Sequence, residues 1–322
     1  MKRIFRAVTA AALLILLLPV RVQAAQMLIP VGRVIGIQLQ SGCVTVAAFD
    51  DALGAAAREA GLRIGDEILK IDDRPVACAQ DVRSALDRSG SSVVLTIRRN
   101  GTESRIPMEP IRSKGSPRLG IYLRQGIAGI GTVTWYDPAT GTFGTLGHGV
   151  SDGKGRLLPM TGGQAYEAEI LSVTKGKCGD PGQLKGSAEG TVSLGTLTKN
   201  TPQGVFGITR QGWRGTCLST ADYEDIRTGS AVILSSVDNR GPQEYSVEIL
   251  KIYPEDRSDC RNLLIRVTDP ELLETTGGIV QGMSGSPIIQ DGKLVGAVTH
   301  VLVNDPTRGY GIFIENMLDA AG

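Results

Sequence analysis

The sequence predicts a mainly β protein, in which a small α+β domain is followed by two antiparallel β-barrels. Three observations lead to this fold class. Glycine accounts for 42 of 322 residues and aromatic residues for only 4%, which favours short strands joined by tight turns. Short alternating strands recur through most of the chain. The length also exceeds what a single hydrophobic core usually holds, so we expect two domains.

The overall charge is balanced, with a formal net charge of +1. Such a mixed charge argues against nucleic acid or another polyanion as the partner. The chain has no C-x-x-C motif and no cluster of histidines and cysteines, so the sequence predicts neither a metal site nor a cofactor.

Residues 1–24 have the pattern of an export signal. Three basic residues lie within the first six, the run 7–20 is apolar but short for a membrane span, and Val22-Gln23-Ala24 offers a cleavage site. A cleaved signal peptide and an uncleaved N-terminal anchor are both compatible with this pattern. Either one predicts that the rest of the chain lies outside the cytoplasm.

The five cysteines are compatible with one or two disulfides in an exported protein, with one thiol left over. Their pairing does not follow from the sequence. They are Cys43, Cys78, Cys178, Cys217 and Cys260.

Residues 34–110 are predicted to form the small α+β domain, after an N-terminal segment at 25–33. The domain is expected to begin with a strand at 34–39, and helices are expected at 52–60 and 79–88. Asn100-Gly101 lies between two alternating runs and predicts a hairpin. The charged, turn-rich stretch 111–118 is interpreted as a linker.

The second domain, 119–322, is expected to consist of short strands with Gly-rich turns. A single helix is expected in this domain, at 315–320. The strands are expected at 120–123, 129–136, 143–146, 166–174, 190–197, 204–210, 230–237 and 244–252.

A G-x-S-G-x-P motif surrounds Ser284 and leads directly into an apolar strand. The glycines allow a tight turn from which the Ser284 hydroxyl projects. The N–H groups of Gly282 and Ser284 are predicted to form an oxyanion hole. The alternative is an ordinary Gly/Ser turn between two strands.

A serine nucleophile needs a base within hydrogen-bond distance, and the chain has only two histidines. His148 lies between two glycines at a strand end and precedes the serine, as in chymotrypsin-type triads. His300 lies within the strand that follows the serine turn, where a packed histidine is the simpler interpretation. We therefore predict His148 as the base and keep His300 as the alternative.

The carboxylate that would orient the histidine is less well indicated. Asp269 preserves the order His, Asp, Ser, although an ordinary Asp-Pro turn explains it equally well. The other candidates are Asp137, Asp152 and Asp180.

Several stretches resemble the stage IV sporulation protein B family of serine peptidases. They are TLGHGVSD around His148, GTLTKNTPQGVFG at 195–207, and the block from Gly282 to Leu318. The resemblance implies a chymotrypsin-like double β-barrel with His148, Asp269 and Ser284 as the catalytic residues. No acidic residue occurs between 275 and 284, so a deep pocket for basic side chains is not indicated on that wall.

The segment GLRIGDEILKIDDRPV at 61–76 resembles the PDZ domains of secreted bacterial proteases. Such domains bind an extended peptide at a sheet edge and hold its terminal carboxylate on loop N–H groups. The resemblance implies that Val34, Ile35, Gly36 and Ile37 form this loop, with the 79–88 helix as the opposite wall. The ligand would be the chain's own N-terminal segment or the C-terminus of a partner.

Family resemblance further implies the biological role. The substrate would belong to a membrane-bound regulatory complex, and its cleavage would trigger intramembrane proteolysis and activate a late sigma factor in sporulation. The expected location is the space between the forespore and mother-cell membranes. Self-cleavage is expected near the N-terminus, between about 25 and 35, where the chain is extended and apolar.

Two alternatives remain at the level of sequence. One is a general quality-control protease of the HtrA type, in which the PDZ domain usually follows the protease instead of preceding it. The other is a non-catalytic PDZ adaptor whose peptidase half serves only as a scaffold. Labelling with an active-site serine reagent would separate an enzyme from an adaptor.

Overall fold

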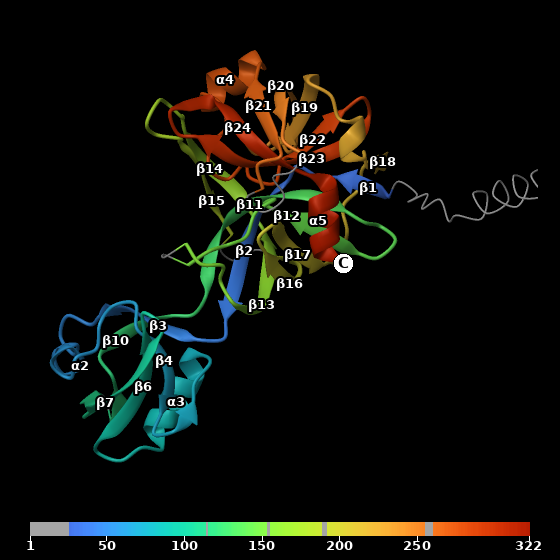
Figure 1. Cartoon of the computed structure of the whole chain (residues 1–322). Helices are drawn as coiled ribbons and strands as arrows, with labels where there is room; N and C mark the ends of the chain where they lie inside the picture. Colours follow the sequence, from blue (N-terminus) through green and yellow to red (C-terminus); the bar gives the residue numbers. More distant parts are fainter. Residues whose placement is uncertain (1–25, 114, 153–154, 189–191, 255–259) are drawn as a thin grey trace, which may run out of the picture.

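The computed structural model describes residues 26–322 except 114, 153–154, 189–191 and 255–259 (Figure 1). The predicted signal segment 1–24 therefore lies outside the described residues. Figure 1 shows a large body made of two β-barrels and a smaller domain that projects from it. No helix among the described residues has both the length and the apolar character needed to cross a membrane.

The first barrel is closed by the pairing of β11 with β12, which joins the two ends of a six-strand path. Its strands follow one another in the order β12, β17, β16, β13, β2, β11. Apolar side chains such as Ile35, Leu39 and Phe143 fill its interior and are fully buried. The strands are β2 (Val34–Ser41), β11 (Ile127–Tyr136), β12 (Thr142–Thr145), β13 (Met160–Glu167), β16 (Ser193–Thr201) and β17 (Gly204–Ile208).

The second barrel closes in the order β19, β20, β21, β24, β23, β22. Its core includes Ile233, Ile249 and Val298, which have no exposed surface. Its strands are β19 (Gly229–Ser235), β20 (Gln243–Ile252), β21 (Leu263–Val267), β22 (Pro287–Gln290), β23 (Lys293–Leu302) and β24 (Asp305–Phe313).

A short N-terminal strand connects the two barrels. β1 (Met27–Pro30) pairs with β11 and with β18 (Leu218–Ser219). Leu28 is fully buried in the cluster that includes Leu294 and Ile312 of the second barrel, whereas Ile29 packs in the first barrel's core. The separate hairpin of β14 (Glu169–Thr174) and β15 (Gln183–Ser187) lies between the barrels and touches the second one through a Leu184–Gln281 backbone hydrogen bond of 2.8 Å.

The small domain is inserted within the first barrel, between β2 and β11. Its sheet runs in the order β10, β3, β4, β6, β7, with β5 paired to β4, and its own core lies under α3. The predicted hairpin at Asn100-Gly101 is confirmed, and both residues have positive φ (52° and 83°), as a type I′ turn requires. Its elements are β3 (Val44–Phe49), α2 (Ala55–Glu59), β4 (Glu67–Ile71), β5 (Arg74–Pro75), α3 (Ala79–Asp87), β6 (Val93–Arg99), β7 (Thr102–Met108), β8 (Ile111–Ser113), β9 (Ser116–Arg118) and β10 (Ile121–Arg124).

The predicted domain boundaries are wrong on both sides of this insertion. Residues 34–41 form β2, which pairs along its length with β11 and β13 of the barrel. Residues 121–124, expected to begin the peptidase half, instead pair with β3 of the small domain. The stretch 111–118 is not a linker but the β8–β9 hairpin. An apolar alternating run shows that a strand forms, but not which sheet it joins, because pairing is a long-range choice.

The described part of the second half contains two α-helices instead of the single helix expected. α5 (Ile314–Ala321) confirms the prediction near the C-terminus, and its buried Met317 packs between the barrels' apolar residues. α4 (Pro270–Thr276) was missed because seven residues give little helical periodicity. Its start signals were present, however: Asp269 caps the helix and Pro270 occupies the first turn.

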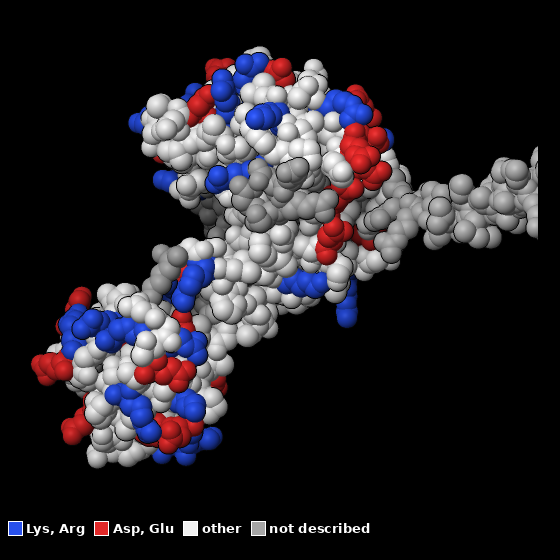
Figure 2. All heavy atoms as spheres, viewed as in Figure 1, with Lys and Arg blue, Asp and Glu red and all other residues white. Residues whose placement is uncertain are grey.

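No disulfide joins any two of the five cysteines in the part of the chain that the structure describes, although the sequence was compatible with one or two. Figure 2 shows positive and negative side chains interspersed over the visible face, in keeping with the balanced net charge.

Candidate active site

Ser284 lies in a tight turn just before β22. Ser286 donates from its N–H to Met283 O (3.0 Å) across this turn. Met283 in turn donates to Val280 O (3.1 Å), and Gly282, with φ of 102°, occupies the third position of that preceding turn. Gly285, with φ of 97°, follows directly, and a Cβ there would lie 2.1 Å from Thr132 O. The predicted glycines are therefore required by backbone conformation and by close approach.

The N–H groups of Gly282 and Ser284 have no hydrogen-bond acceptor among the described residues, whereas those of Met283, Gly285 and Ser286 do. Both donors belong to residues that line the same cavity. This arrangement leaves them available to a carbonyl oxygen that develops negative charge, which is the role predicted for them.

His148 follows a strained turn at the end of β12. Gly147 donates from its N–H to Thr145 O (2.9 Å), two residues back, and Leu146 between them has a φ of 70°. These are the features of a γ-turn with a positive central φ, a rare conformation. The turn directs His148 out of the barrel wall toward the serine. Sequence reasoning found the flanking glycines but not the strain at Leu146.

Two buried threonines of β11 connect the two barrels at the site. Thr132 Oγ1 donates to Gly282 O (2.9 Å), and Thr134 Oγ1 donates to Gly285 O (2.7 Å). The backbone N–H of Thr132 also donates to Ser284 O (3.1 Å). These contacts hold the serine turn against the strand that precedes His148. The sequence showed only two alternating threonines, and their role depends on residues 150 positions away.

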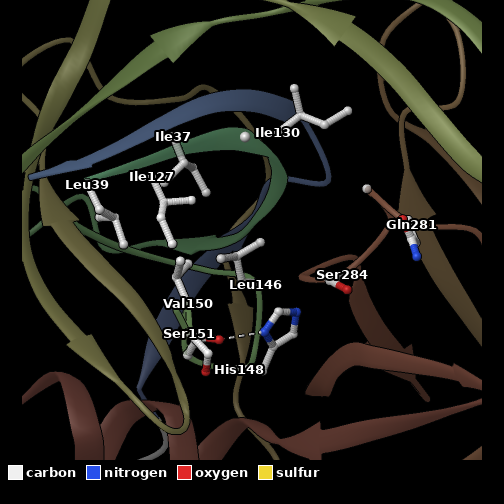
Figure 3. Close-up of a pocket in the computed structure, with 13 residues that line it drawn as sticks. Ile37, Leu39, Ile127, Ile130, Leu146, His148, Val150, Ser151, Gln281 and Ser284 are labelled. Atoms are coloured by element: carbon white, nitrogen blue, oxygen red, sulfur yellow. Dashed lines mark hydrogen bonds between the residues drawn. The ribbon is translucent and has the colours of Figure 1, made fainter. Parts of the chain in front are cut away.

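Ser284 and His148 line one cavity between the barrels, with a volume of about 330 Å³ (Figure 3). Its remaining wall is mostly apolar and comes from the first barrel, through Ile37, Leu39, Ile127, Ile130, Leu146 and Val150. The wall is suited to apolar side chains of an extended peptide.

The Ser284 hydroxyl is not bonded to His148 in this structure. Its Oγ donates to Thr299 O (2.7 Å), and no Ser284–His148 hydrogen bond forms among the described residues. His148 Nδ1 instead lies 3.0 Å from Gly149 O. If Nδ1 carries the proton and donates to this carbonyl, Nε2 is left as the basic nitrogen.

Burial lowers the pKa of His148 below its usual value, and the hydrogen bond to Gly149 O offsets only part of this effect. The imidazole is therefore kept neutral, which is the form that can accept a proton. The alternative base, His300, lies beside it, with ring centroids 5.2 Å apart. His148, unlike His300, lines the cavity that contains Ser284.

Asp269 does not orient His148. Its carboxylate caps α4 by accepting from the N–H of Leu272 (3.0 Å), and it also accepts from the N–H of Ser246 (3.3 Å). Among the described residues, no carboxylate accepts a hydrogen bond from His148. The order along the chain suggested Asp269, but the start of α4 holds it on another side of the second barrel. The only partner that the structure shows for His148 Nδ1 is a main-chain carbonyl.

Val34, Ile35, Gly36 and Ile37 do not form a peptide-binding loop. They lie in β2, where Val34, Ile35 and Ile37 are buried in the barrel. In the small domain a groove of about 460 Å³ instead lies between α3 and β10. At the start of β10, the N–H groups of Leu119 and Gly120 have no acceptor among the described residues, and Gly120 has a φ of 69°.

Comparison with known proteins gives a family for most of the chain. The family described as SpoIVB peptidase S55 matches residues 115–318, and a PDZ domain matches residues 52–99. The inserted domain is therefore a PDZ domain, and the double barrel is the peptidase.

Solved structures give weaker likenesses. The active form of the Rv3671c protease from M. tuberculosis has 17% sequence identity and a TM-score of 0.36, and the match covers 62% of this chain and 75% of that one. The PDZ domain of the SdrC-like protein (Lmo2051) from Listeria monocytogenes has 23% identity and a TM-score of 0.22, over 26% of this chain and 87% of that one.

A curated relative from Agrobacterium fabrum, named "Putative zinc metalloprotease Atu1380", is 32% identical over 109 residues. The match covers 34% of this chain and only 28% of that protein.

The nucleophile turn, the histidine turn and the family match over residues 115–318 agree: the chain belongs to the SpoIVB peptidase S55 family and is a serine peptidase with an inserted PDZ domain.

Proposed function

We propose that this serine peptidase is an endopeptidase of an extracytoplasmic signalling pathway. It would cleave a protein of a membrane-bound regulatory complex, trigger intramembrane proteolysis and lead to late sigma-factor activation in sporulation. The family supports this role, and the export pattern of residues 1–24 supports a location between the forespore and mother-cell membranes. The observation that carries the chemistry is that Ser284, His148 and two open N–H donors face one cavity.

The chemistry proceeds in two halves. Ser284 Oγ leaves Thr299 O, gives its proton to His148 Nε2 and attacks the peptide carbonyl, and the N–H groups of Gly282 and Ser284 stabilise the oxyanion. His148 then protonates the leaving amine, and water hydrolyses the acyl-enzyme with His148 as base. Among the described residues, Gly149 O is the acceptor at His148 Nδ1, the position that an orienting carboxylate occupies in a triad.

The expected self-cleavage between about 25 and 35 needs correction. Residues 27–30 and 34–41 are paired in β1 and β2, and Leu28 and Ile35 are fully buried. A bond in these strands cannot enter an active site unless the barrel opens. We therefore propose that any self-cleavage falls before Met27.

The test uses the full chain from Met1, made in a cell-free system without signal peptidase, as wild type and as Ser284→Ala. A fluorophosphonate should label the wild type at Ser284 and leave the variant unlabelled, which would exclude a non-catalytic adaptor. N-terminal sequencing over time then reports trimming. Trimming by the wild type alone supports self-cleavage, whereas equal trimming of both proteins indicates a contaminating protease. Broad degradation of unfolded proteins such as casein would favour the quality-control alternative over the signalling role.

A further inference from the structure

One edge of β11 is open beside the catalytic cavity. β2 pairs with the other edge of the strand from Ile127 to Thr132, and β12 pairs only from Val133 onward. Among the described residues, no strand pairs with the remaining edge between Ile127 and Gly131. An unpaired edge of this kind can bind an extended peptide by backbone hydrogen bonds.

The direction of the backbone groups on this edge follows from their neighbours. Val133 donates from its N–H to Arg33 O (2.9 Å), on the side of β2, whereas Thr132 donates to Ser284 O (3.1 Å), on the opposite side. Backbone groups alternate along a strand, so Ala128 and Ile130 present their N–H and C=O groups on the side of Ser284. A peptide that forms hydrogen bonds with these groups, antiparallel to β11, has its N-terminal end near Ser284 and its C-terminal end farther from it.

The PDZ domain has a second open strand edge, and a peptide antiparallel to it would run in the same N-to-C direction as one bound to β11. β10 is the end strand of its sheet, and the groove between β10 and α3 is lined by Leu86, Leu119, Ile121 and Leu123. A peptide antiparallel to β10 would end at Leu119 and Gly120, whose free N–H groups can receive a terminal carboxylate.

These two edges belong to one continuous ribbon. Only Gln125 and Gly126 separate β10 from β11, and β3 and β2 cover the opposite edges of the same two strands. Figure 1 shows β2 and β11 descending together from the barrels to the PDZ domain. The open edges therefore follow one another on one side of the ribbon, from Ser284 to the PDZ groove.

We propose that the enzyme binds a protein substrate by the C-terminal tail of that substrate. The tail's apolar end occupies the PDZ groove, the preceding residues extend along β11, and the cut falls at a fixed distance from the C-terminus. This inference rests on the proposed peptidase function. From Ile121 to Gly131 the ribbon extends about ten residue steps, roughly 33 Å at ~3.3 Å per residue. We therefore expect cleavage about 8–14 residues before the substrate's C-terminus.

The charges around the groove fit a free carboxylate. Arg83 and Arg118 line it, with Asp87 as the only acidic lining residue. An amidated C-terminus would lose both the charge attraction and two charge-assisted hydrogen bonds.

The experiment uses randomised peptides of about 25 residues that end in Val-Leu-Val, made once with a free carboxylate and once as the C-terminal amide. Mass spectrometry reports the cut position after incubation with the full exported chain. Cuts should cluster about 8–14 residues from the free C-terminus, and amidation should slow them at least about tenfold. Cuts at any distance, at equal rates in the two libraries, would overturn the inference.

Two variant pairs locate the effect. Arg118→Glu should imitate amidation, whereas Arg112→Glu on β8, which does not line the groove, should not. Ala128→Pro removes one N–H from the open edge and should slow cleavage of both libraries, whereas Glu103→Pro on β7, the end strand at the far side of the PDZ sheet, should not.

Fluorophosphonate labelling of Ser284 distinguishes a failure of tail binding from a failure of the peptidase function. Labelled enzyme that cuts without regard to distance, or cuts neither library, contradicts tail binding and leaves the peptidase function standing. Wild type that is neither labelled nor active contradicts both.

Discussion

The serine side and the histidine side of the active site are fixed in different ways. Ser284 belongs to a turn held by backbone hydrogen bonds within its own barrel and by threonines of the other barrel. His148 follows a strained turn at Leu146, and its hydrogen-bond partner among the described residues is the carbonyl of Gly149. The nucleophile turn is thus held by hydrogen bonds from both barrels, whereas the base depends on one strained turn and one hydrogen bond.

The most severe test of this comparison removes the hydroxyl itself. Ser284→Ala should lower kcat about 10⁴–10⁶-fold, because the acyl-enzyme forms on the hydroxyl that this change removes. The fold should change little, since only one hydrogen bond to Thr299 O is lost. Peptide hydrolysis and a thermal melt measure the two effects. Residual activity near wild type would remove Ser284 from its proposed role.

The second test loosens the serine turn without touching the serine. Thr134→Val leaves the buried Gly285 carbonyl without its donor, so we expect a loss of about 1–3 kcal/mol in the free energy of unfolding. kcat should fall about tenfold or more as the turn moves. The exposed Thr102→Val on β7 is the control and should stay within about 0.5 kcal/mol of the wild type. Urea titration and steady-state kinetics check the pair, and an unchanged kcat would show that the turn does not need this support.

The third test concerns the carboxylate. Asp269→Ala should reduce stability by about 1 kcal/mol, the usual loss for a helix N-cap, and leave kcat nearly unchanged. Asp269→Ser keeps a capping oxygen and should recover the stability. A true triad carboxylate would instead lower kcat by about 10⁴-fold. Such a loss for both variants would show that Asp269 reaches His148 in the working enzyme.

The fourth and smallest effect is on pH dependence. Because burial lowers the pKa of His148, the neutral form persists below the usual histidine value of 6.5. The acidic limb of kcat/KM should therefore have its midpoint below 6.5. Because the pKa of His148 is lower in the folded than in the unfolded chain, protonation favours the unfolded chain. The contribution of neutral His148 to the free energy of unfolding is therefore present above pH 6.5 and is lost as the pH falls below that value. A midpoint above 6.5 would point to a nearby carboxylate.

Local sequence was most informative where a residue type is required by its own backbone. The glycines around Ser284, the Asn100-Gly101 turn and the helix at 79–87 could be predicted because the conformation depends on a few neighbouring residues. The cap and proline at the start of α4 were equally visible, but the short helix behind them was not.

The long-range assignments failed for one physical reason. Val34–Ile37 and residues 121–124 were each predicted as strands in the wrong sheet, because strand pairing depends on partners that are far away in the sequence. Asp269 was selected by its order along the chain, and order does not determine which side of a barrel a residue faces.

By itself, the sequence determined the mainly β class, the nucleophile turn, the two candidate histidines and the hairpins, since these follow from backbone permissiveness and local periodicity. Only the tertiary structure decided that the PDZ domain is inserted between β2 and β11 and that Thr132 and Thr134 support the serine turn. It alone also placed Gly149 O beside His148 Nδ1. These features depend on which strands close each barrel, a choice made by burial of the whole core and not by any short stretch of residues.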